Sequence, residues 1–302
     1  MMQIPFVKMH GIGNDYVYLD RTSRKRDRAS RRRGRAADAP ECAMPDVAEE
    51  QWPALAQAIA DRHFGVGGDG LVLILRGDAA PLRMRMFNAD GSEAEMCGNA
   101  VRCVARYARD TGLVEGDRFS IETMRRAVAM EMLGDGRVCA DMGAPMTIDN
   151  GAEFTPAPLA PETLTIDGVE QEFTPVSMGN PHAVVFVDDL DFDLAAVGTR
   201  WEHHPRFPQR TNTEFVVPLA RDRLRMRVWE RGSGETLACG TGACAAAVAA
   251  VVTGRADRRV TLHLRGGDLE IHWSPDDNHV YMTGPASYVF SGTFTWQTTE
   301  QS

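Results

Sequence analysis

The chain has 302 residues, of which 43% are apolar and 25% are charged, a composition typical of a globular protein with one large domain or two smaller ones. No apolar run approaches the roughly 20 residues that cross a bilayer, so we expect no membrane span. The first residues lack a basic segment followed by an apolar core, and six cysteines do not suggest a disulfide scaffold in a chain this long. We therefore expect a cytoplasmic protein with reduced thiols.

The net charge of −9 is unevenly distributed. Residues 21–35 carry nine Arg or Lys and one Asp, which leaves about −17 on the remainder. Such a run can bind phosphate backbones, but this one has no interleaved aromatic residues, and the acidic remainder would repel nucleic acid. We therefore expect no nucleic-acid partner and interpret residues 21–35 as a solvated, mobile loop.

Lysine is scarce, which bears on cofactor chemistry. Only Lys8 lies outside the basic run, where Lys25 is found. A pyridoxal-phosphate enzyme needs a lysine in its pocket to form the Schiff base. The composition therefore disfavours that cofactor.

The first half is predicted to contain short strands and two helices. Strands are expected over 3–10 and 16–20, on either side of a Gly-Asn-Asp turn. Helical periodicity over 46–65 predicts a helix that ends at Gly65. The later elements are strands over 71–75 and 82–91, a helix over 98–109 and strand-like pieces between 118 and 142.

A Pro-rich stretch over 155–164, together with residues 142–146, suggests a junction between two domains. The second half is then dominated by strands, with one helix predicted over 240–253. The predicted strands are 183–187, 212–219, 223–232, 259–264, 268–273 and 279–284.

Two stretches resemble each other, "EMCGNAVRCVARYARD" from Glu95 and "LACGTGACAAAVAAVV" from Leu237. In both, Cys-Gly opens a predicted helix, a glutamate lies four residues before the cysteine, and a polar residue at a strand end lies nine before it. The matched pairs are Cys97 and Cys239, Glu93 and Glu235, and Asn88 and Glu230. We interpret the halves as two copies of one αβ unit related by a pseudo-twofold, with a ligand cleft between them.

The position of the two cysteines indicates acid–base chemistry. Unpaired N–H groups at a helix N-terminus stabilise a thiolate and lower its pKa, and they can also hold a carboxylate. The glycine that follows each cysteine lets a ligand approach those N–H groups. If Cys97 and Cys239 face opposite sides of one carbon, one removes its proton and the other returns a proton to the opposite face. This arrangement predicts a racemase or epimerase that needs no cofactor.

Other readings of these residues remain. Cys97 and Cys239 could form a disulfide, which in the cytosol would be an oxidised, inactive state. Zinc ligation is disfavoured, because the spacings C-x5-C and C-x4-C differ from the tight knuckle of structural zinc sites. Gly65–Gly70 satisfies G-x-G-x-x-G, but a helix precedes it and a strand follows, the reverse of a dinucleotide site. We expect no role in catalysis for the remaining candidates, Cys42, Cys103, Cys139, Cys244, His203 and His204.

Six motifs carry a resemblance to a known family. They are "KMHGIGNDY", "FNADGSEAEMCGNAVRC", "GNPH", "RTNTEF", "ERGSGETLACGTGACA" and "YMTG". In this order, over nearly the whole chain, they resemble the diaminopimelate epimerases. Proline racemases and hydroxyproline epimerases share the two-cysteine fold, but their first cysteine is typically followed by Gly-His, whereas this chain has Gly98-Asn99.

The resemblance implies an α+β fold of two pseudo-symmetric domains, each a mostly antiparallel sheet wrapped around a central helix. It places the domains at 1–141 and 142–285, with a tail at 286–302 that returns to the first domain. It also implies conversion of LL-2,6-diaminopimelate to the meso isomer without cofactor or metal, in lysine and peptidoglycan precursor synthesis. A cytoplasmic homodimer is the implied form.

The resemblance assigns roles to individual positions. Cys97 and Cys239 match the two acid–base cysteines, and His182 and Glu230 match residues that tune the thiols. The positions matching backbone donors to the α-carboxylate are Gly98, Asn99, Gly240 and Thr241. The positions matching the polar shell around the substrate are Asn14, Asn88, Asn180, Asn212, Glu230 and Arg231, where the Arg231 guanidinium suits the distal carboxylate.

Two departures from the family pattern are visible. The family often has glutamine or a small residue where this chain has Gly70, so a glutamine contact to substrate would be absent. The Arg-rich segment at about 21–45 lengthens a normally short loop. A racemase of proline-like substrates, a nucleic-acid-binding protein and a zinc-stabilised structural protein stay open as alternative functions.

Overall fold

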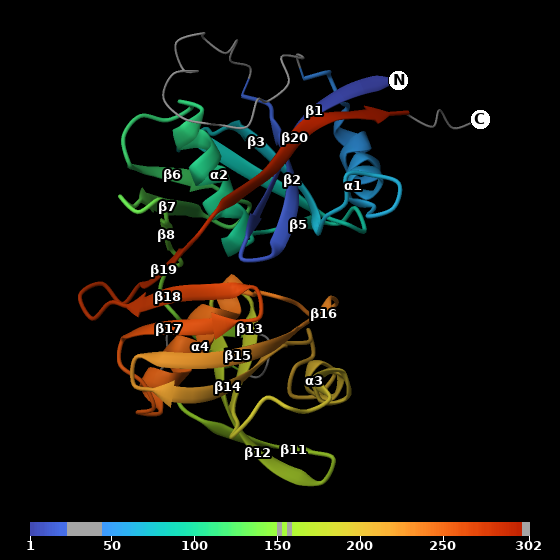
Figure 1. Ribbon diagram of the computed structural model, residues 1–302. Coiled ribbons are helices and arrows are strands. Elements are labelled where there is room, and N and C mark those ends of the chain that lie inside the picture. Colours follow the sequence, from blue (N-terminus) through green and yellow to red (C-terminus); the bar gives the residue numbers. More distant parts are fainter. Residues whose placement is uncertain (23–43, 150–152, 156–158, 298–302) are drawn as a thin grey trace. The chain divides into compact units, whose positions relative to one another are not determined.

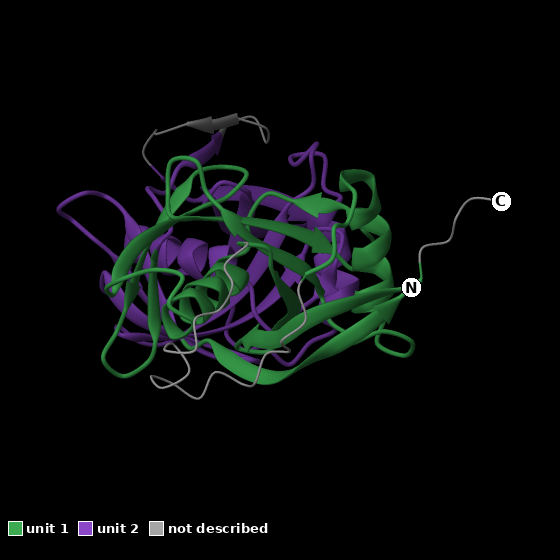
Figure 2. Ribbon diagram, turned by 90° about the horizontal axis from the view of Figure 1, so that it is seen from above, with its two compact units in different colours: residues 1–140, 285–302 green, residues 141–284 purple. Residues whose placement is uncertain are grey.

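The computed structural model describes residues 1–22, 44–149, 153–155 and 159–297. The chain divides into two compact units (Figures 1 and 2). The first unit is Met1–Ala140 with Pro285–Ser302, and the second unit is Asp141–Gly284. Nearly all of the Arg-rich segment, including Cys42, lies outside the described residues. The prediction that this segment is mobile therefore concerns residues outside the described ranges. Within the described ranges, no helix is long and apolar enough to span a membrane.

The first unit is built from nine strands, two α-helices and one 3-10 turn in its described part. They are β1 (Met2–Gly11), β2 (Asn14–Asp20), η2 (Glu49–Gln51), α1 (Trp52–Ala60), β3 (Gly70–Arg76), β4 (Leu82–Asn88), β5 (Glu93–Ala94), α2 (Gly98–Asp110), β6 (Arg118–Glu122), β7 (Ala127–Met132), β8 (Val138–Asp141) and β20 (Ser287–Trp296).

The second unit carries the remaining described elements. They are β9 (Thr147–Asp149), β10 (Glu153–Thr155), β11 (Glu162–Ile166), β12 (Val169–Ser177), β13 (Pro181–Phe186), α3 (Leu194–Glu202), β14 (Asn212–Ala220), β15 (Arg223–Glu230), β16 (Gly234–Glu235), α4 (Gly240–Val252), β17 (Arg259–Leu264), β18 (Gly267–Trp273) and β19 (Val280–Gly284). The described part of the Pro-rich stretch therefore belongs to this unit.

The two units repeat one topology. In the first, β2 runs parallel to β3 and β4 parallel to β6. In the second, β13 runs parallel to β14 and β15 parallel to β17. Most other neighbours are antiparallel, and each short strand before a cysteine, β5 or β16, pairs with the strand that precedes it. The predicted mostly antiparallel, duplicated α+β architecture is confirmed.

In each unit one helix lies on the inner face of the curved sheet and another lies on the outer face. Helix α2 contacts β1, β2 and β7, while α1 packs against β3 and β4 from the other side. Successive side chains of a strand point to opposite faces of the sheet. On the face covered by α1, Leu71 and Leu73 of β3 join the apolar cluster around Trp52. The last strand, β20, pairs with β1 from Met2↔Trp296 onward.

The second unit surrounds its inner helix almost completely. Helix α4 contacts β12, β13, β14, β15, β17, β18 and β19, and ten of its residues, Gly240 and Gly242–Ala250, are buried. A helix buried on all sides needs no polar face, which explains its Gly-, Ala- and Val-rich sequence. On the outer face, α3 packs through Trp201 against Phe173, with ring centroids 5.4 Å apart.

Some element predictions were wrong. The first helix ends at Ala60 rather than Gly65, because Asp61 leaves helical geometry and its Oδ1 accepts the N–H groups of His63 and Phe64. Helix α3 was not predicted, although Asp193 caps it by accepting the N–H of Ala196 at 3.1 Å. The β11–β12 hairpin was also missed.

Gly70 lies where β3 and β4 approach very closely, opposite Asn88. A β-carbon at this position would lie 2.0 Å from the carbonyl oxygen of Phe87. No side chain fits there in this backbone, so neither glutamine nor any other residue could reach a ligand from position 70 without moving β4. The absence of a glutamine side chain at position 70 thus agrees with the close approach of β3 and β4.

We expect Gly70→Ala to destabilise the protein by about 1–3 kcal/mol, because a β-carbon must push the two strands apart. Urea unfolding followed by circular dichroism would measure the change. Gly134→Ala is the matched control, since a β-carbon at Gly134 meets nothing within 4 Å, and it should stay within about 0.5 kcal/mol of the parent. Equal unfolding midpoints for the two variants would contradict the close approach.

Candidate active site

Each predicted acid–base cysteine is the N-cap of the inner helix of its unit. Cys97 precedes α2 in extended geometry, and its Sγ accepts the N–H of Ala100 at 3.5 Å. Cys239 precedes α4, and its Sγ accepts the N–H of Gly242 at 3.4 Å. A capping acceptor satisfies an N–H group that the helix itself leaves unpaired. The sulfurs are therefore held at the positive end of each helix.

The turn that leads into each cysteine is fixed by an equivalent ion pair. Arg85 Nε donates to Glu93 at 2.7 Å across β4 and β5, and Arg227 Nε donates to Glu235 at 2.8 Å across β15 and β16. Both arginines make a second contact to the same carboxylate, at 3.0 Å in each case. This bidentate geometry gives the glutamates four residues before each cysteine a structural role.

In the first unit two asparagines adjoin Cys97. The Cys97 thiol donates to Asn14 Oδ1 at 3.3 Å, and Asn99 Nδ2 donates to the same oxygen at 3.4 Å. Asn14 Nδ2 in turn donates to Asp69 at 2.7 Å. The buried Arg102 holds Asn99 Oδ1 at 2.8 Å and the carbonyl of Gly98 at 3.1 Å. The structure thus brings Asn14, Gly98 and Asn99 to Cys97.

Asn88, also predicted to belong to the polar shell, lies at the end of β4. Its Nδ2 donates to Ser92 Oγ at 3.0 Å, and its backbone N–H donates to the Ser92 carbonyl at 2.8 Å. These contacts close the turn between β4 and β5. They leave the Asn88 Oδ1 as the group that could accept a hydrogen bond from a ligand.

In the second unit Thr241, Asn180 and Glu230 gather around Cys239. Thr241 Oγ1 lies 3.5 Å from the Cys239 sulfur, and Asn180 Nδ2 donates to that same oxygen at 3.3 Å. Glu230 accepts a hydrogen bond from Thr236 Oγ1 at 2.5 Å, and its negative charge acts on the Cys239 thiol. Asn180 and Asn14 occupy equivalent places, since each follows a glycine with positive φ, Gly179 and Gly13 respectively.

Beneath the first turn of α4 lies a buried pair that the sequence analysis identified only in part. His182 Nδ1 is 2.7 Å from Glu214 Oε1, and both side chains are 0% exposed. His182 Nε2 is 3.0 Å from Asn180 Oδ1. His182 was predicted to belong to the site, but Glu214 was missed. Its signal was a glutamate in an apolar strand, "NTEFVV", at a position where strand alternation points inward.

Asn212 and Arg231 adjoin each other at the edge of this half-site. Asn212 is buried, donates to the carbonyl of Pro181 at 3.0 Å and accepts the N–H of Arg231 at the same distance. The Arg231 side chain is exposed, and its Nη1 donates to the carbonyl of Gln209 at 3.2 Å. Its guanidinium pairs with no carboxylate that the structure describes, which leaves it able to bind one.

The prediction of a lowered pKa is wrong for Cys239. Burial, followed by the negative charges of Glu230 and Glu214, raises the pKa of the Cys239 thiol well above its usual value. Hydrogen bonds from Thr241 and the N–H of Gly242 act in the opposite direction but do not outweigh these effects. Burial also raises the pKa of Glu230. Cys239 is therefore held as a neutral thiol at pH 7.

Two further cysteines of the described chain lie within the inner helices. Cys103 and Cys244 are buried inside α2 and α4, and burial raises the pKa of Cys103 to about 11. Among the described residues, no group of three or more His, Cys, Asp and Glu side chains is arranged as metal ligands would be.

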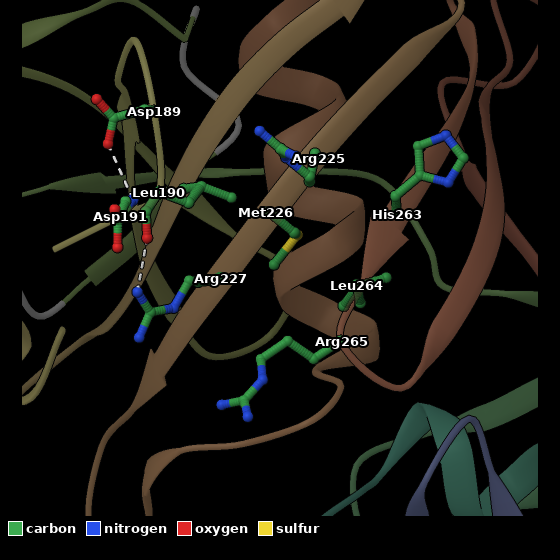
Figure 3. A pocket seen from close by; sticks show the side chains of 9 residues that line it. All are labelled: Asp189, Leu190, Asp191, Arg225, Met226, Arg227, His263, Leu264 and Arg265. Carbon is green, nitrogen blue, oxygen red and sulfur yellow. Dashed lines mark hydrogen bonds between the residues drawn. The ribbon is translucent and has the colours of Figure 1, made fainter. Parts of the chain in front are cut away.

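The second unit also has a surface hollow of about 420 Å³, but it contains none of the predicted site residues. Figure 3 shows it between β15, β17 and the loop over 189–191. Its basic side chains are largely engaged, since Arg227 donates to the carbonyl of Leu190 at 2.7 Å and Arg265 pairs with Glu235 at 3.0 Å. The hollow therefore offers no second set of groups suited to catalysis.

Known proteins share both the sequence and the fold. The family model described as diaminopimelate epimerase matches residues 6–148 and 174–289. The diaminopimelate epimerase of Moorella thermoacetica is 49% identical over 296 residues, which cover 96% of this chain and 98% of that protein. The chain belongs to the diaminopimelate epimerase family. The Synechocystis sp. member is 47% identical over 300 residues, covering 96% of this chain and 99% of that one.

Solved structures confirm the fold of this family member. A phenazine biosynthesis protein of the PhzF family from Bacillus anthracis gives a TM-score of 0.65 at 16% identity, covering 97% of this chain and 99% of that one. A hydroxyproline epimerase from Agrobacterium vitis, with bound trans-4-hydroxy-L-proline, gives 0.64 at 13% identity, covering 97% and 91%. At these identities the likeness concerns the architecture.

We expect Glu230→Gln to lower the pKa of Cys239, because a neutral amide removes the negative charge that opposes the thiolate. The pH dependence of iodoacetamide alkylation at Cys239, resolved by peptide mass spectrometry, should then move to lower pH. Glu172→Gln on β12, exposed on the outside of the unit, is the control and should leave the profile unchanged. An unchanged or higher midpoint in Glu230→Gln would show that Glu230 does not hold Cys239 protonated.

Proposed function

We propose that this chain is a diaminopimelate epimerase that interconverts LL-2,6-diaminopimelate and meso-2,6-diaminopimelate. The observation that carries the proposal is a cysteine at the N-terminus of a buried helix in each of two repeated units, within a chain of this family. The setting would be lysine and peptidoglycan precursor synthesis. A cytoplasmic homodimer is part of the proposal and rests on the family resemblance.

The reaction needs one base and one acid on opposite faces of the α-carbon, and Cys97 and Cys239 fill these roles. One sulfur, as thiolate, takes the α-proton and becomes a thiol, while the C–H electron pair stays on carbon as a carbanion. The other sulfur, as thiol, gives its proton to the opposite face and becomes the thiolate. The raised pKa of Cys239 supports its resting as the thiol, which makes it the donor in the direction where Cys97 is the base.

The carbanion is the costly species, and the helix N-termini are suited to stabilise it. Its negative charge spreads into the α-carboxylate, so donors aimed at that carboxylate act mainly on the transition state. In our proposal these donors are the backbone N–H groups of Gly98, Asn99, Gly240 and Thr241. The sulfur caps use the N–H groups of Ala100 and Gly242 instead, so the two tasks do not compete.

The polar shell would select a long, doubly zwitterionic substrate. We assign the distal carboxylate to Arg231, whose guanidinium pairs with no carboxylate in the described structure, and the remaining ammonium and carboxylate groups to Asn14, Asn88, Asn180 and Asn212. A proline-like ring has no distal carboxylate and would leave Arg231 unused. Gly98-Asn99, in place of Gly-His, favours diaminopimelate for the same site.

Proton NMR of LL-diaminopimelate with the reduced protein in D2O tests this function. We expect loss of the α-proton signal and formation of the meso isomer, slowed by about 10²–10⁴-fold in Cys97→Ala and in Cys239→Ala because each removes one acid–base group. Cys139→Ala, a change in β8, should retain full turnover. No exchange by the folded parent protein would remove the substrate assignment, and proline and hydroxyproline would then be tried.

Arg231→Lys tests the distal contact. A lysine ammonium cannot form the two parallel hydrogen bonds that a guanidinium gives a carboxylate. We expect KM for diaminopimelate to rise about tenfold or more, with a smaller change in kcat, in steady-state assays. Arg225→Lys, on the exposed part of β15, is the control and should leave KM unchanged. An unaltered KM in Arg231→Lys would place the distal carboxylate elsewhere.

A further inference from the structure

The two units of the repeat differ directly beneath their cysteine-capped helices. Tyr16 pairs with Gly70 in the β2–β3 ladder as His182 pairs with Asn212 in the β13–β14 ladder, so the registers can be aligned. The equivalent pairs are Tyr16 and His182, Val72 and Glu214, Asn99 and Thr241, and Ala100 and Gly242. The first unit therefore forms an equivalent cysteine-capped first helical turn although it has an apolar valine at the position of Glu214. A buried His–Glu pair is not needed to form the repeat.

The second unit makes room for this pair. A β-carbon on Gly242 would lie 2.5 Å from Glu214 Oε1, whereas the equivalent position in the first unit is Ala100, which carries a β-carbon. Glu214 Oε2 is buried and has no hydrogen-bond partner among the described residues. Burying a carboxyl that is only half satisfied is unfavourable, so the fold alone gives no reason to keep it.

The hydrogen bonds around His182 run in one direction. Asn180 Oδ1 can only accept, so the contact to His182 Nε2 at 3.0 Å requires a hydrogen on Nε2. The contact between Nδ1 and Glu214 Oε1 at 2.7 Å holds a second hydrogen. With two hydrogens the pair has no net charge, whichever atom carries the shared one.

The orientation of the Asn180 side-chain amide determines whether the Thr241 hydroxyl donates or accepts. With its oxygen facing His182, Asn180 presents Nδ2 to Thr241 Oγ1 at 3.3 Å. Thr241 Oγ1 then accepts a hydrogen bond, and its own hydrogen is available to the Cys239 sulfur at 3.5 Å. Asn180 keeps a second amide hydrogen for a ligand. The chain of contacts therefore ends with a donor aimed at Cys239.

We propose that the buried Glu214 is a positioning residue that acts through His182 and Asn180 to hold the Thr241 hydroxyl as a hydrogen-bond donor to the Cys239 sulfur. The thiolate of Cys239 is thereby stabilised in the half-reaction that makes it. The catalytic meaning of this contact rests on the proposed epimerase function, while the contact itself does not.

The other groups that face Cys239 show why such a donor matters. Glu230 acts on Cys239 from β15 and Glu214 from β14, while Thr241 lies on the helix that Cys239 caps. His182 on β13 pairs with Glu214 and its charge acts on Glu230. Burial and the two carboxylates oppose a thiolate at this position. A two-base reaction nevertheless requires each sulfur to carry a negative charge in turn. A fixed hydroxyl donor offsets part of that penalty without adding a net charge.

The pH dependence of iodoacetamide alkylation at Cys239, followed by peptide mass spectrometry, tests the contact without any substrate. Thr241→Val keeps the side-chain shape and removes the hydroxyl, and we expect alkylation about tenfold slower at any pH below the midpoint. Thr241→Ser keeps the hydroxyl and should stay within about twofold of the parent. Cys139 in the same sample is the internal reference. Equal rates for Thr241→Val and the parent would overturn the proposal.

Glu214→Ala and Glu214→Gln test the positioning role. Both lack the carboxylate charge, but the Gln amide can still donate to His182 Nδ1, so their difference isolates that hydrogen bond. We expect Glu214→Ala to be alkylated about fivefold or more slowly than Glu214→Gln at Cys239. On a Thr241→Val background this difference should vanish, because the route to the sulfur is already lost. The same difference on both backgrounds would show that Glu214 acts another way.

A purely structural role for Glu214 would lower the melting temperature of Glu214→Ala and leave its alkylation midpoint equal to that of Glu214→Gln. This outcome would also overturn the proposal. Alkylation is measured at a temperature at which circular dichroism shows every variant folded. If Glu214→Ala does not fold, Glu214→Leu takes its place, since leucine fills the site without a hydrogen bond. If the alkylation series holds but the protein exchanges no diaminopimelate proton, the proposed function fails and this contact stands.

Discussion

A hydrogen bond from a backbone N–H to a cysteine sulfur, at the first turn of a buried helix, is the interaction on which the candidate site depends. It fixes the sulfur at the positive end of the helix and leaves the neighbouring N–H groups for an anion. Access of an anion to those N–H groups is easiest where no side chain covers the helix end. The Gly98 and Gly240 that follow the cysteines carry no side chain, and the curved sheets close around the rest of each helix.

The two copies of the unit have kept this interaction and changed what surrounds it. Strand alternation gives each sheet one face toward its inner helix, and in the first unit that face carries Val72 where the second carries Glu214. One sulfur therefore lies among asparagines and the other among ionisable groups. A reaction that takes a proton from one face and returns one to the other starts with one thiolate and one thiol, and the surroundings of Cys239 favour the thiol there.

The sequence predicted the parts of the fold that local patterns determine. The helices that begin at Gly98 and Gly240 were predicted because Cys-Gly precedes an apolar, helix-forming run, and most strands of both units follow from alternation or continuous apolar runs. Helix α1 was predicted too long because Asp61 can bond its own following N–H groups, which competes with the helix. Helix α3 was missed although Asp193 starts it.

The site was predictable where a motif names the residue and was not where packing decides the chemistry. The cysteines and their asparagine and threonine neighbours came from motifs, whereas Glu214 is functionally interpretable only once its burial and its contact with His182 are known. The direction of the pKa shift of Cys239 was predicted wrongly for the same reason. Proximity to a helix end can be read from a sequence, but the depth of burial that outweighs it cannot.

The pairing of β1 with β20 has a consequence for the way the chain is made. Gln3 and Thr295 bond across this ladder although they stand 292 positions apart. Met2–Phe6 extend beyond the stretch of β1 that pairs with β2 and find their partners in β20. On the ribosome the second unit, whose residues are contiguous, can finish folding first, while the first unit waits for the last strand to emerge. A translation product that stops short of β20 would therefore leave β1 as an open sheet edge, a target for aggregation or proteolysis.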